Sequence, residues 1–156
     1  MKKINLETAR SFIGNETGVS DWVNIDQGMI NGFADITRDW QFIHVDPEKA
    51  KASPFGRTIA HGFLTLSFLS HFAETAALSI EGARMLVNYG FDKLRFLSPV
   101  PSGARIRGKF VLKDMQERAP GQILFSYTVT VEVEGEEKPA LMADWLMLFI
   151  FDSGQS

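Results

Sequence analysis

The chain of 156 residues contains no cysteine. Disulfides, a thiol nucleophile and a cysteine-based zinc site are therefore absent, which excludes cysteine-dependent catalysis and is consistent with a reducing compartment. An excess of positive charge is also missing, because 16 Lys and Arg residues stand against 19 Asp and Glu residues and give a net charge of −3. Without a basic stripe, we expect no nucleic-acid partner.

Long apolar runs are missing as well. The two most apolar segments, 62–78 and 141–151, are interrupted by polar or charged residues and are too short to span a membrane. The first residues include two lysines, but no apolar run follows that could serve as a signal peptide. We therefore expect a cytoplasmic protein without a membrane partner. There is no internal repeat, low-complexity tract or linker, and 45% apolar residues suit a single domain covering residues 1–156.

Several kinds of site leave no signature in the sequence. A glycine-rich phosphate loop and a Gly-x-Ser-x-Gly motif are absent, so nucleotide binding and serine hydrolysis are not indicated. No two of the three histidines, His44, His61 and His71, have the i, i+4 or short-loop spacing of known metal sites. The sequence predicts neither a metal ion nor a cofactor.

Hydrophobic periodicity indicates an α+β domain. Apolar residues cover nearly every direction around the segment Gly62 to Leu78, which predicts a long helix buried on most sides. Capping signals at Asp26 and Asp46-Pro47 predict short helices near 27–38 and 48–52. Strand-like runs bounded by Gly or Pro turns predict a curved antiparallel sheet that wraps the long helix, with strands near 17–25, 84–97, 104–115, 122–134 and 140–151.

The final strand differs from the others because it is apolar on both faces, apart from Asp144. A strand of this kind lies deep in a sheet or meets another subunit.

The segment around Asp39 and His44 carries the chemistry. Residues five apart point in different directions on a helix and to opposite faces of a strand. The two side chains can therefore meet only if the segment is an irregular loop, and its apolar residues would anchor that loop against the core: Trp40, Phe42, Ile43 and Val45.

A carboxylate and an imidazole can together hold one water molecule and move its protons. An ordinary structural role remains open at this point, because an Asp that caps a turn and a His that bonds the backbone are common in globular domains.

A family resemblance adds to this interpretation. The pattern from Phe33 through the run 39–47 and on to Ala60-His61-Gly62 resembles the MaoC-like dehydratases, the (R)-specific enoyl-CoA hydratases of the hot dog fold. With Gln41 where many members have Asn, it is most similar to the subgroup named after nodulation protein N. The close match runs from about 21 to 70, and a weaker one covers 95–103.

The resemblance implies an α+β hot dog fold and reversible addition of water to a 2-enoyl thioester, carried by CoA or an acyl carrier. It implies Asp39 as the base and His44 as the group that orients water and returns a proton, although these roles could be exchanged. The backbone N–H of Gly62, at a helix start, would stabilise the thioester oxyanion.

Three further residues have weaker roles in the same comparison. Gln41 could position the loop or the substrate. Ser67 matches a serine often found behind the catalytic pair, although a hydrogen bond back within its own helix is an equal alternative. His61 is expected near the substrate, shaping the start of the helix.

Two other functions fit the same fold. A hot dog thioesterase would cleave a similar acyl thioester, and a non-catalytic module would only bind one. The apolar last strand and the general pairing of hot dog sheets predict a homodimer in each case.

Overall fold

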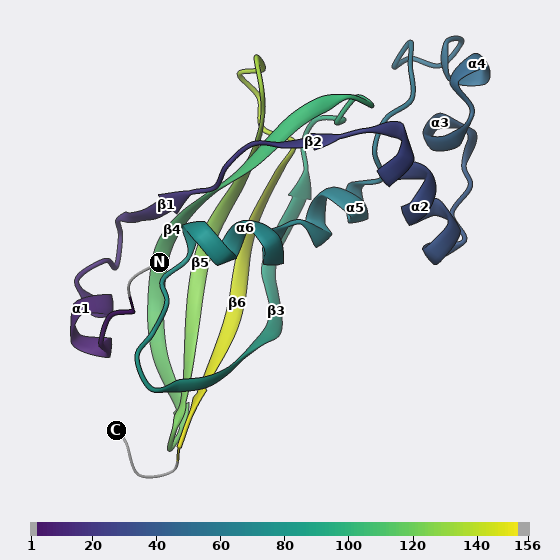
Figure 1. The fold of residues 1–156 in the computed structure, drawn as a ribbon. Helices are drawn as coiled ribbons and strands as arrows, with labels where there is room; N and C mark the ends of the chain where they lie inside the picture. The colour runs from purple at the N-terminus through teal and green to yellow at the C-terminus, as the bar shows by residue number, and fades with distance from the viewer. Residues whose placement is uncertain (1–2, 153–156) are drawn as a thin grey trace.

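One antiparallel sheet forms the frame of the protein in the computed structural model, which describes residues 3–152 (Figure 1). Two short strands, β1 and β2, both pair with β4, and the order β1-β4-β5-β6-β3 leaves β3 at an edge. The strands are β1 (Glu16–Val19), β2 (Val23–Ile25), β3 (Ala83–Phe96), β4 (Ala104–Ala119), β5 (Gln122–Val133) and β6 (Leu141–Phe151).

The predicted strands are confirmed with two differences. The run 17–25 is split into β1 and β2, and β4 extends to Ala119 rather than ending near 115. The polar end of β4 is a strand because it pairs with the start of β5, for example Glu117 with Ile123, so partner pairing sets its length where the apolar pattern fades. β6 lies between β5 and β3, as its two apolar faces indicated.

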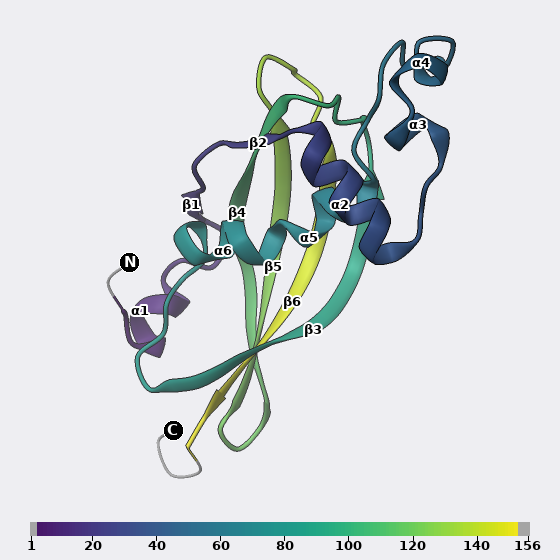
Figure 2. The same cartoon turned by 45° about the vertical axis from the view of Figure 1, so that its right-hand side comes forward.

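Two helices in line, α5 (Gly62–Ser67) and α6 (Leu69–Ala76), cross one face of the sheet (Figures 1 and 2). The prediction of one long helix from Gly62 to Leu78 is therefore wrong, because the helix is interrupted between α5 and α6. The interruption falls directly after Ser67, whose hydroxyl donates to the carbonyl oxygen of Phe63 at 2.7 Å. Such a bond competes with the backbone ladder and bends helices. A curved sheet around a central helical segment is the hot dog arrangement.

The central helices approach the sheet closely because glycine stands beneath them. Phe72 of α6 is fully buried against β4. A Cβ atom at Gly108 would lie 2.8 Å from Cβ of Phe72, a separation that real side chains do not tolerate. The core that this contact joins is continuous, and its largest fully buried members include Phe72, Phe110, Phe125, Tyr127 and Leu141.

The remaining helices include α1 (Leu6–Arg10), which the sequence did not predict, and three that form a lobe beyond the sheet: α2 (Gln27–Thr37), α3 (Phe42–Val45) and α4 (Pro47–Ala50). Figures 1 and 2 show this α2–α4 lobe beside the start of α5. The predicted caps are confirmed, since the carboxylate of Asp26 accepts from the N–H of Met29 at 2.8 Å and that of Asp46 from the N–H of Lys49 at 3.1 Å.

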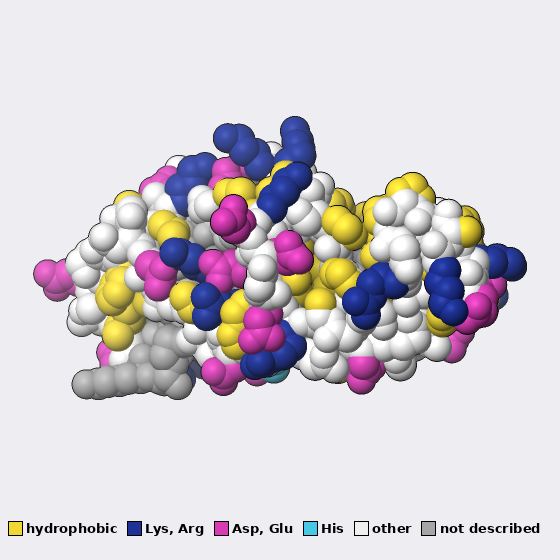
Figure 3. Space-filling view, turned by 90° about the horizontal axis from the view of Figure 1, so that it is seen from above, with side chains coloured by type: hydrophobic (Ala, Val, Ile, Leu, Met, Phe, Trp, Pro, Cys, Tyr) yellow, Lys and Arg dark blue, Asp and Glu magenta, His cyan; other side chains and the backbone are white. Residues whose placement is uncertain are grey.

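The surface has no dominant sign of charge in the view of Figure 3, where basic and acidic side chains intermix. Within residues 3–152, no helix is both long enough and apolar enough to cross a membrane.

Candidate active site

Asp39 lies just after α2, where the chain turns sharply. Arg38 ends that helix in the left-handed conformation with φ 61°, and the N–H of Asp39 donates to the carbonyl oxygen of Ala34. Gln41 then begins the single turn of α3. The prediction that the whole segment is irregular is therefore wrong for Phe42–Val45, and the reversal occurs at residues 38–41 instead.

His44 is buried on α3, and the chain fixes the state of its ring. Nδ1 lies 2.7 Å from the carbonyl oxygen of Ile59. A carbonyl can only accept, so Nδ1 carries the hydrogen and Nε2 of the neutral ring carries the lone pair. Burial lowers the pKa of His44 from its ordinary value of 6.5, outweighing the opposing effect of the bond to Ile59. His44 is therefore a neutral proton acceptor near pH 7.

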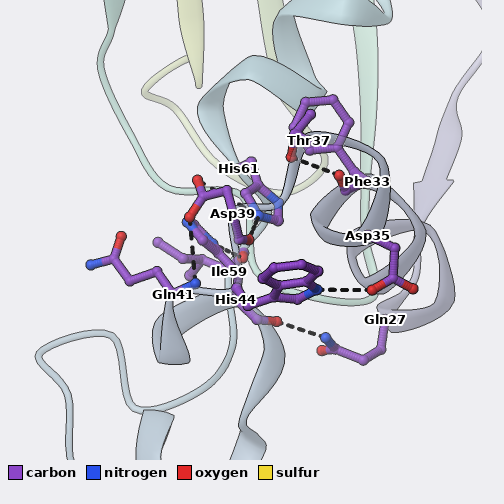
Figure 4. A network of polar contacts seen from close by, with 10 residues as sticks. Gln27, Phe33, Asp35, Thr37, Asp39, Gln41, His44, Ile59 and His61 are labelled. Atoms are coloured by element: carbon purple, nitrogen blue, oxygen red, sulfur yellow. Dashed lines mark hydrogen bonds and ion pairs between the residues drawn. The ribbon is translucent and has the colours of Figure 1, made fainter.

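His61 supports both members of the pair. Its ring stacks on that of His44 with centroids 3.9 Å apart, and its Nε2 lies 2.9 Å from the main-chain oxygen of Asp39 (Figure 4). One carboxylate oxygen of Asp39 lies 4.0 Å from the same Nε2. His61 thus holds the backbone of Asp39 and the face of the His44 ring.

Asp39 and His44 come together as predicted. A carboxylate oxygen of Asp39 and one ring nitrogen from each of His44 and His61 lie within 4.8 Å of one another. A water molecule with hydrogen bonds of about 2.8 Å bridges two atoms at such a separation.

The same three side chains could be read as a metal site, which their sequence spacing did not reveal. The ring nitrogens do not suit one as they stand. Nε2 of His61 faces the carbonyl oxygen of Asp39 and so carries a hydrogen, while the buried Nδ1 lacks a hydrogen-bond partner among the described residues. With its hydrogen on Nε2, His61 keeps a lone pair only on Nδ1, on the side of the ring away from Asp39, so the three side chains do not direct three lone pairs to one point.

A cavity of about 300 Å³ opens beside His44 and Gly62. Its wall includes Thr65, which is buried, and Phe96, whose ring lies 3.0 Å from the position of a Cβ on Gly62. The sequence did not single out these two residues, because a threonine inside a helix and a phenylalanine at a strand end are ordinary. The remaining lining is mostly apolar and comes from Phe55, Ile59, Ala60, residues 97–100 and Ala140.

Gln41 and Ser67 are not brought to this cavity. Gln41 is exposed at the start of α3, and Figure 4 shows its side chain directed away from Asp39 and His44. Ser67 is exposed and bonds back to Phe63, which was the alternative left open for it.

The expectation that the apolar residues beside Asp39 anchor the loop in the core is wrong for two of them. Trp40 is 54% exposed and Phe42 is 43% exposed. Trp40 instead donates its ring N–H to the carboxylate of Asp35 at 2.8 Å, which fixes the loop by a polar contact on the surface (Figure 4).

Known proteins are similar to this chain over most of its length. The chain is 50% identical over 153 residues to Nodulation protein N of Rhizobium meliloti (strain 1021), covering 97% of this chain and 95% of that one. It is 44% identical over 137 residues to 3-hydroxyacyl-thioester dehydratase Z of Mycobacterium tuberculosis (strain ATCC 25618 / H37Rv), with 88% and 90% covered.

Among solved structures, the (R)-hydratase from A. caviae involved in PHA biosynthesis superimposes with a TM-score of 0.72 at 20% identity, covering 86% of this chain and 94% of that one. This likeness concerns the fold. The MaoC like domain family matches residues 8–135, most of the chain. The protein is therefore a member of the MaoC-like dehydratase family.

Proposed function

We propose that this protein is an (R)-specific 2-enoyl-thioester hydratase, which adds water reversibly and on one face to a trans-2-enoyl thioester of CoA or an acyl carrier. The observation that carries the proposal is the fixed state of His44, whose Nδ1 carries the hydrogen bonded to Ile59 while a ring nitrogen lies within 4.8 Å of a carboxylate oxygen of Asp39. The 44% identity to a 3-hydroxyacyl-thioester dehydratase supports the same reaction class.

The geometry favours exchanging the two roles expected from the sequence. A neutral imidazole with hydrogen on Nδ1 has no proton to give at Nε2 until it has taken one. His44 therefore takes a proton from the water, the hydroxide adds to Cβ, and the Nε2–H of the resulting imidazolium delivers that proton to Cα. Asp39 orients the water and stabilises the imidazolium. Because one atom takes and returns the proton, hydroxyl and hydrogen reach the same face.

The thioester oxygen gains negative charge in the intermediate. Gly62 is the first residue of α5 and borders the cavity, and its N–H is not used by the helix, whose first internal bond runs from Thr65 to His61. We assign this N–H as the oxyanion donor. Thr65, buried in the same wall, is available to contact the substrate.

Incubation with crotonyl-CoA tests the function. A hydratase removes the conjugated double bond and its absorbance, whereas a thioesterase releases free thiol, and a binding module does neither. Asp39→Asn and His44→Ala are matched controls, and each should lower kcat by about 10²-fold or more without loss of folding. Release of thiol without loss of the double bond would show that the protein is a thioesterase and that the proposed hydratase function is wrong.

The stereochemistry is tested in the dehydrating direction. (R)-3-hydroxybutyryl-CoA should regain the double bond with the wild-type enzyme, and the (S) enantiomer should not. Equal rates with both would contradict the proposed single-face addition.

We also infer that the protein acts as a homodimer, for the second of the two expected reasons, the pairing of sheet edges, and not for the first, the apolar last strand. β6 is covered by its neighbours in the sheet, whereas the edge strand β3 exposes several large apolar side chains: Met85, Leu86, Val87, Tyr89, Phe91 and Phe96. A long apolar edge needs a partner strand. A second copy pairing along β3 supplies one and covers Phe96 beside the cavity. The expected cytoplasmic location and lack of a nucleic-acid partner stay predictions.

A further inference from the structure

Gln27, the first residue of α2, ties that helix to α3 and to the segment around Thr58. Its side-chain nitrogen donates to the main-chain oxygen of His44 at 2.7 Å and to the side chain of Asn31 at 2.9 Å. Its side-chain oxygen accepts from the hydroxyl of Thr58 at 2.6 Å. Figure 4 shows the Gln27 side chain reaching the His44 carbonyl from the opposite side of the segment to Gln41.

These contacts close a ring of hydrogen bonds around His44. The imidazole is bonded to the carbonyl oxygen of Ile59, and the N–H of Ile59 donates to the carbonyl oxygen of Ile43 at 3.0 Å. Thr58 is the residue before Ile59 and is buried. Gln27 therefore joins the backbone of His44 to the segment Thr58-Ile59, which also fixes the imidazole of His44.

This closed set of hydrogen bonds matters because α3 is too short to be stable on its own. It has four residues, and Gln41 at its start makes no side-chain capping bond. A helix of one turn does not form on its own, since nucleation costs more than a single turn returns. The His44 carbonyl is one of the groups at the helix end that lack an internal partner, and Gln27 supplies that partner.

The chemistry of the amide suits this position. A carbonyl must be met by a donor, so the nitrogen of Gln27 faces His44 and its oxygen faces the Thr58 hydroxyl. Glutamate would place a second acceptor against the His44 carbonyl, and a hydrocarbon of the same length would leave both partners unpaired.

We infer that Gln27, acting with Thr58, is a positioning residue that sets the direction and ring state of His44 for proton transfer. The inference rests on the proposed function where it concerns turnover, but the state of the His44 ring is measurable without substrate.

The main test compares Gln27→Met, close in size and lacking both polar groups, with Asn31→Ala. Asn31 is exposed and accepts a hydrogen bond from the same amide nitrogen, so its replacement removes neither the bond to His44 nor the bond to Thr58. ¹⁵N-labelled histidine NMR reports which ring nitrogen carries hydrogen, and the His44 signals are identified by their loss in His44→Ala.

We expect wild-type protein and Asn31→Ala to hold hydrogen on Nδ1 of His44, and Gln27→Met to show a mixture of the two tautomers. Hydration of crotonyl-CoA should lose about 10- to 100-fold in kcat in Gln27→Met, with little change in KM, because the reacting group is misdirected while the cavity remains.

A second pair of variants covers the case in which Gln27→Met does not fold. Thr58→Val should reproduce the tautomer mixture and the loss of kcat, and Thr58→Ser, which restores the hydroxyl, should recover both. If the ring state of His44 is unchanged in folded Gln27→Met or Thr58→Val, the inference is overturned. It is also overturned if the ring state changes while turnover stays at the wild-type level.

Failure of the proposed function gives a different pattern. Wild-type protein would then leave crotonyl-CoA unchanged, while the tautomer comparison would still decide whether Gln27 and Thr58 set the state of His44.

Discussion

Replacing Gly62 by proline and by alanine separates the oxyanion donor from the space around it. Both replacements add a Cβ, which would lie 3.0 Å from the Phe96 ring, and Phe96 is 47% exposed and can yield. Only proline removes the N–H. Proline is tolerated at the first position of a helix, and the preceding His61, with φ −60° and ψ 137°, already has the backbone that a following proline requires.

The difference between the two variants therefore measures the replacement of the N–H by the proline ring, with the effect of the added Cβ removed. Loss of one oxyanion-hole donor costs about 10²- to 10³-fold in kcat, roughly 2.7–4 kcal/mol. We expect Gly62→Ala to turn over crotonyl-CoA faster than Gly62→Pro by this factor. The melting temperatures of the two variants should be close to each other. A folded Gly62→Pro that turns over as fast as Gly62→Ala would show that this N–H does not stabilise the intermediate.

Three other predictions concern pH, assembly and stability. Because burial lowers the pKa of His44, the neutral ring persists below pH 6.5, so kcat/KM should fall only on the acid side of that value. The charge of Asp39 opposes this lowering of the His44 pKa, so the acid-side fall of kcat/KM should lie at still lower pH for the residual activity of Asp39→Asn. A fall at higher pH than in the wild type would refute His44 as the base. Sedimentation at micromolar concentration should give a dimer, and Leu86→Asp on β3 a monomer; a wild-type monomer contradicts the proposed edge pairing. Tyr127→Phe leaves the buried N–H of Leu78 without the phenol oxygen that accepts from it at 3.2 Å, and should cost about 1–3 kcal/mol in denaturant unfolding. An unchanged free energy of unfolding would mean that another group meets that N–H.

Much of the fold follows from local patterns. The alternation in β5 and the capping residues Asp26 and Asp46 depend on neighbours in the chain, and the structure has the strands and caps that they predict. The break between α5 and α6 falls next to the hydrogen bond from Ser67 back to Phe63, and the apolar pattern of the segment contains no signal for it. The edge position of β3 depends on strand order, which periodicity alone does not contain.

In the candidate site, too, the sequence predicted the residues that are close in the chain but not the partners that only the fold brings to them. Asp39 and His44 are close in the chain, and the sequence indicated that they could meet if the segment between them left regular structure, which the turn at residues 38–41 does. The partners that fix these two residues are distant in the chain: Ile59 is 15 residues from His44, and His61 is 22 residues from Asp39. Gln27 was passed over because a glutamine at a helix start is common, and only the fold places it against His44.

The two halves of the site rest on supports of different rigidity. Gly62 and Phe96 belong to the central helix and the sheet, whose packing forms the core. Asp39 and His44 belong to a lobe of short helices with an exposed outer surface that includes Ile36, Trp40 and Phe42. Ile30 anchors this lobe in the core, but hydrogen bonds and the stacked ring of His61 hold the two site residues themselves. Local opening of such a lobe costs less than global unfolding. Substitutions among those bonds should therefore lower turnover before they lower the melting temperature, whereas substitutions beneath the central helices, such as Gly108→Ala against Phe72, should do the reverse.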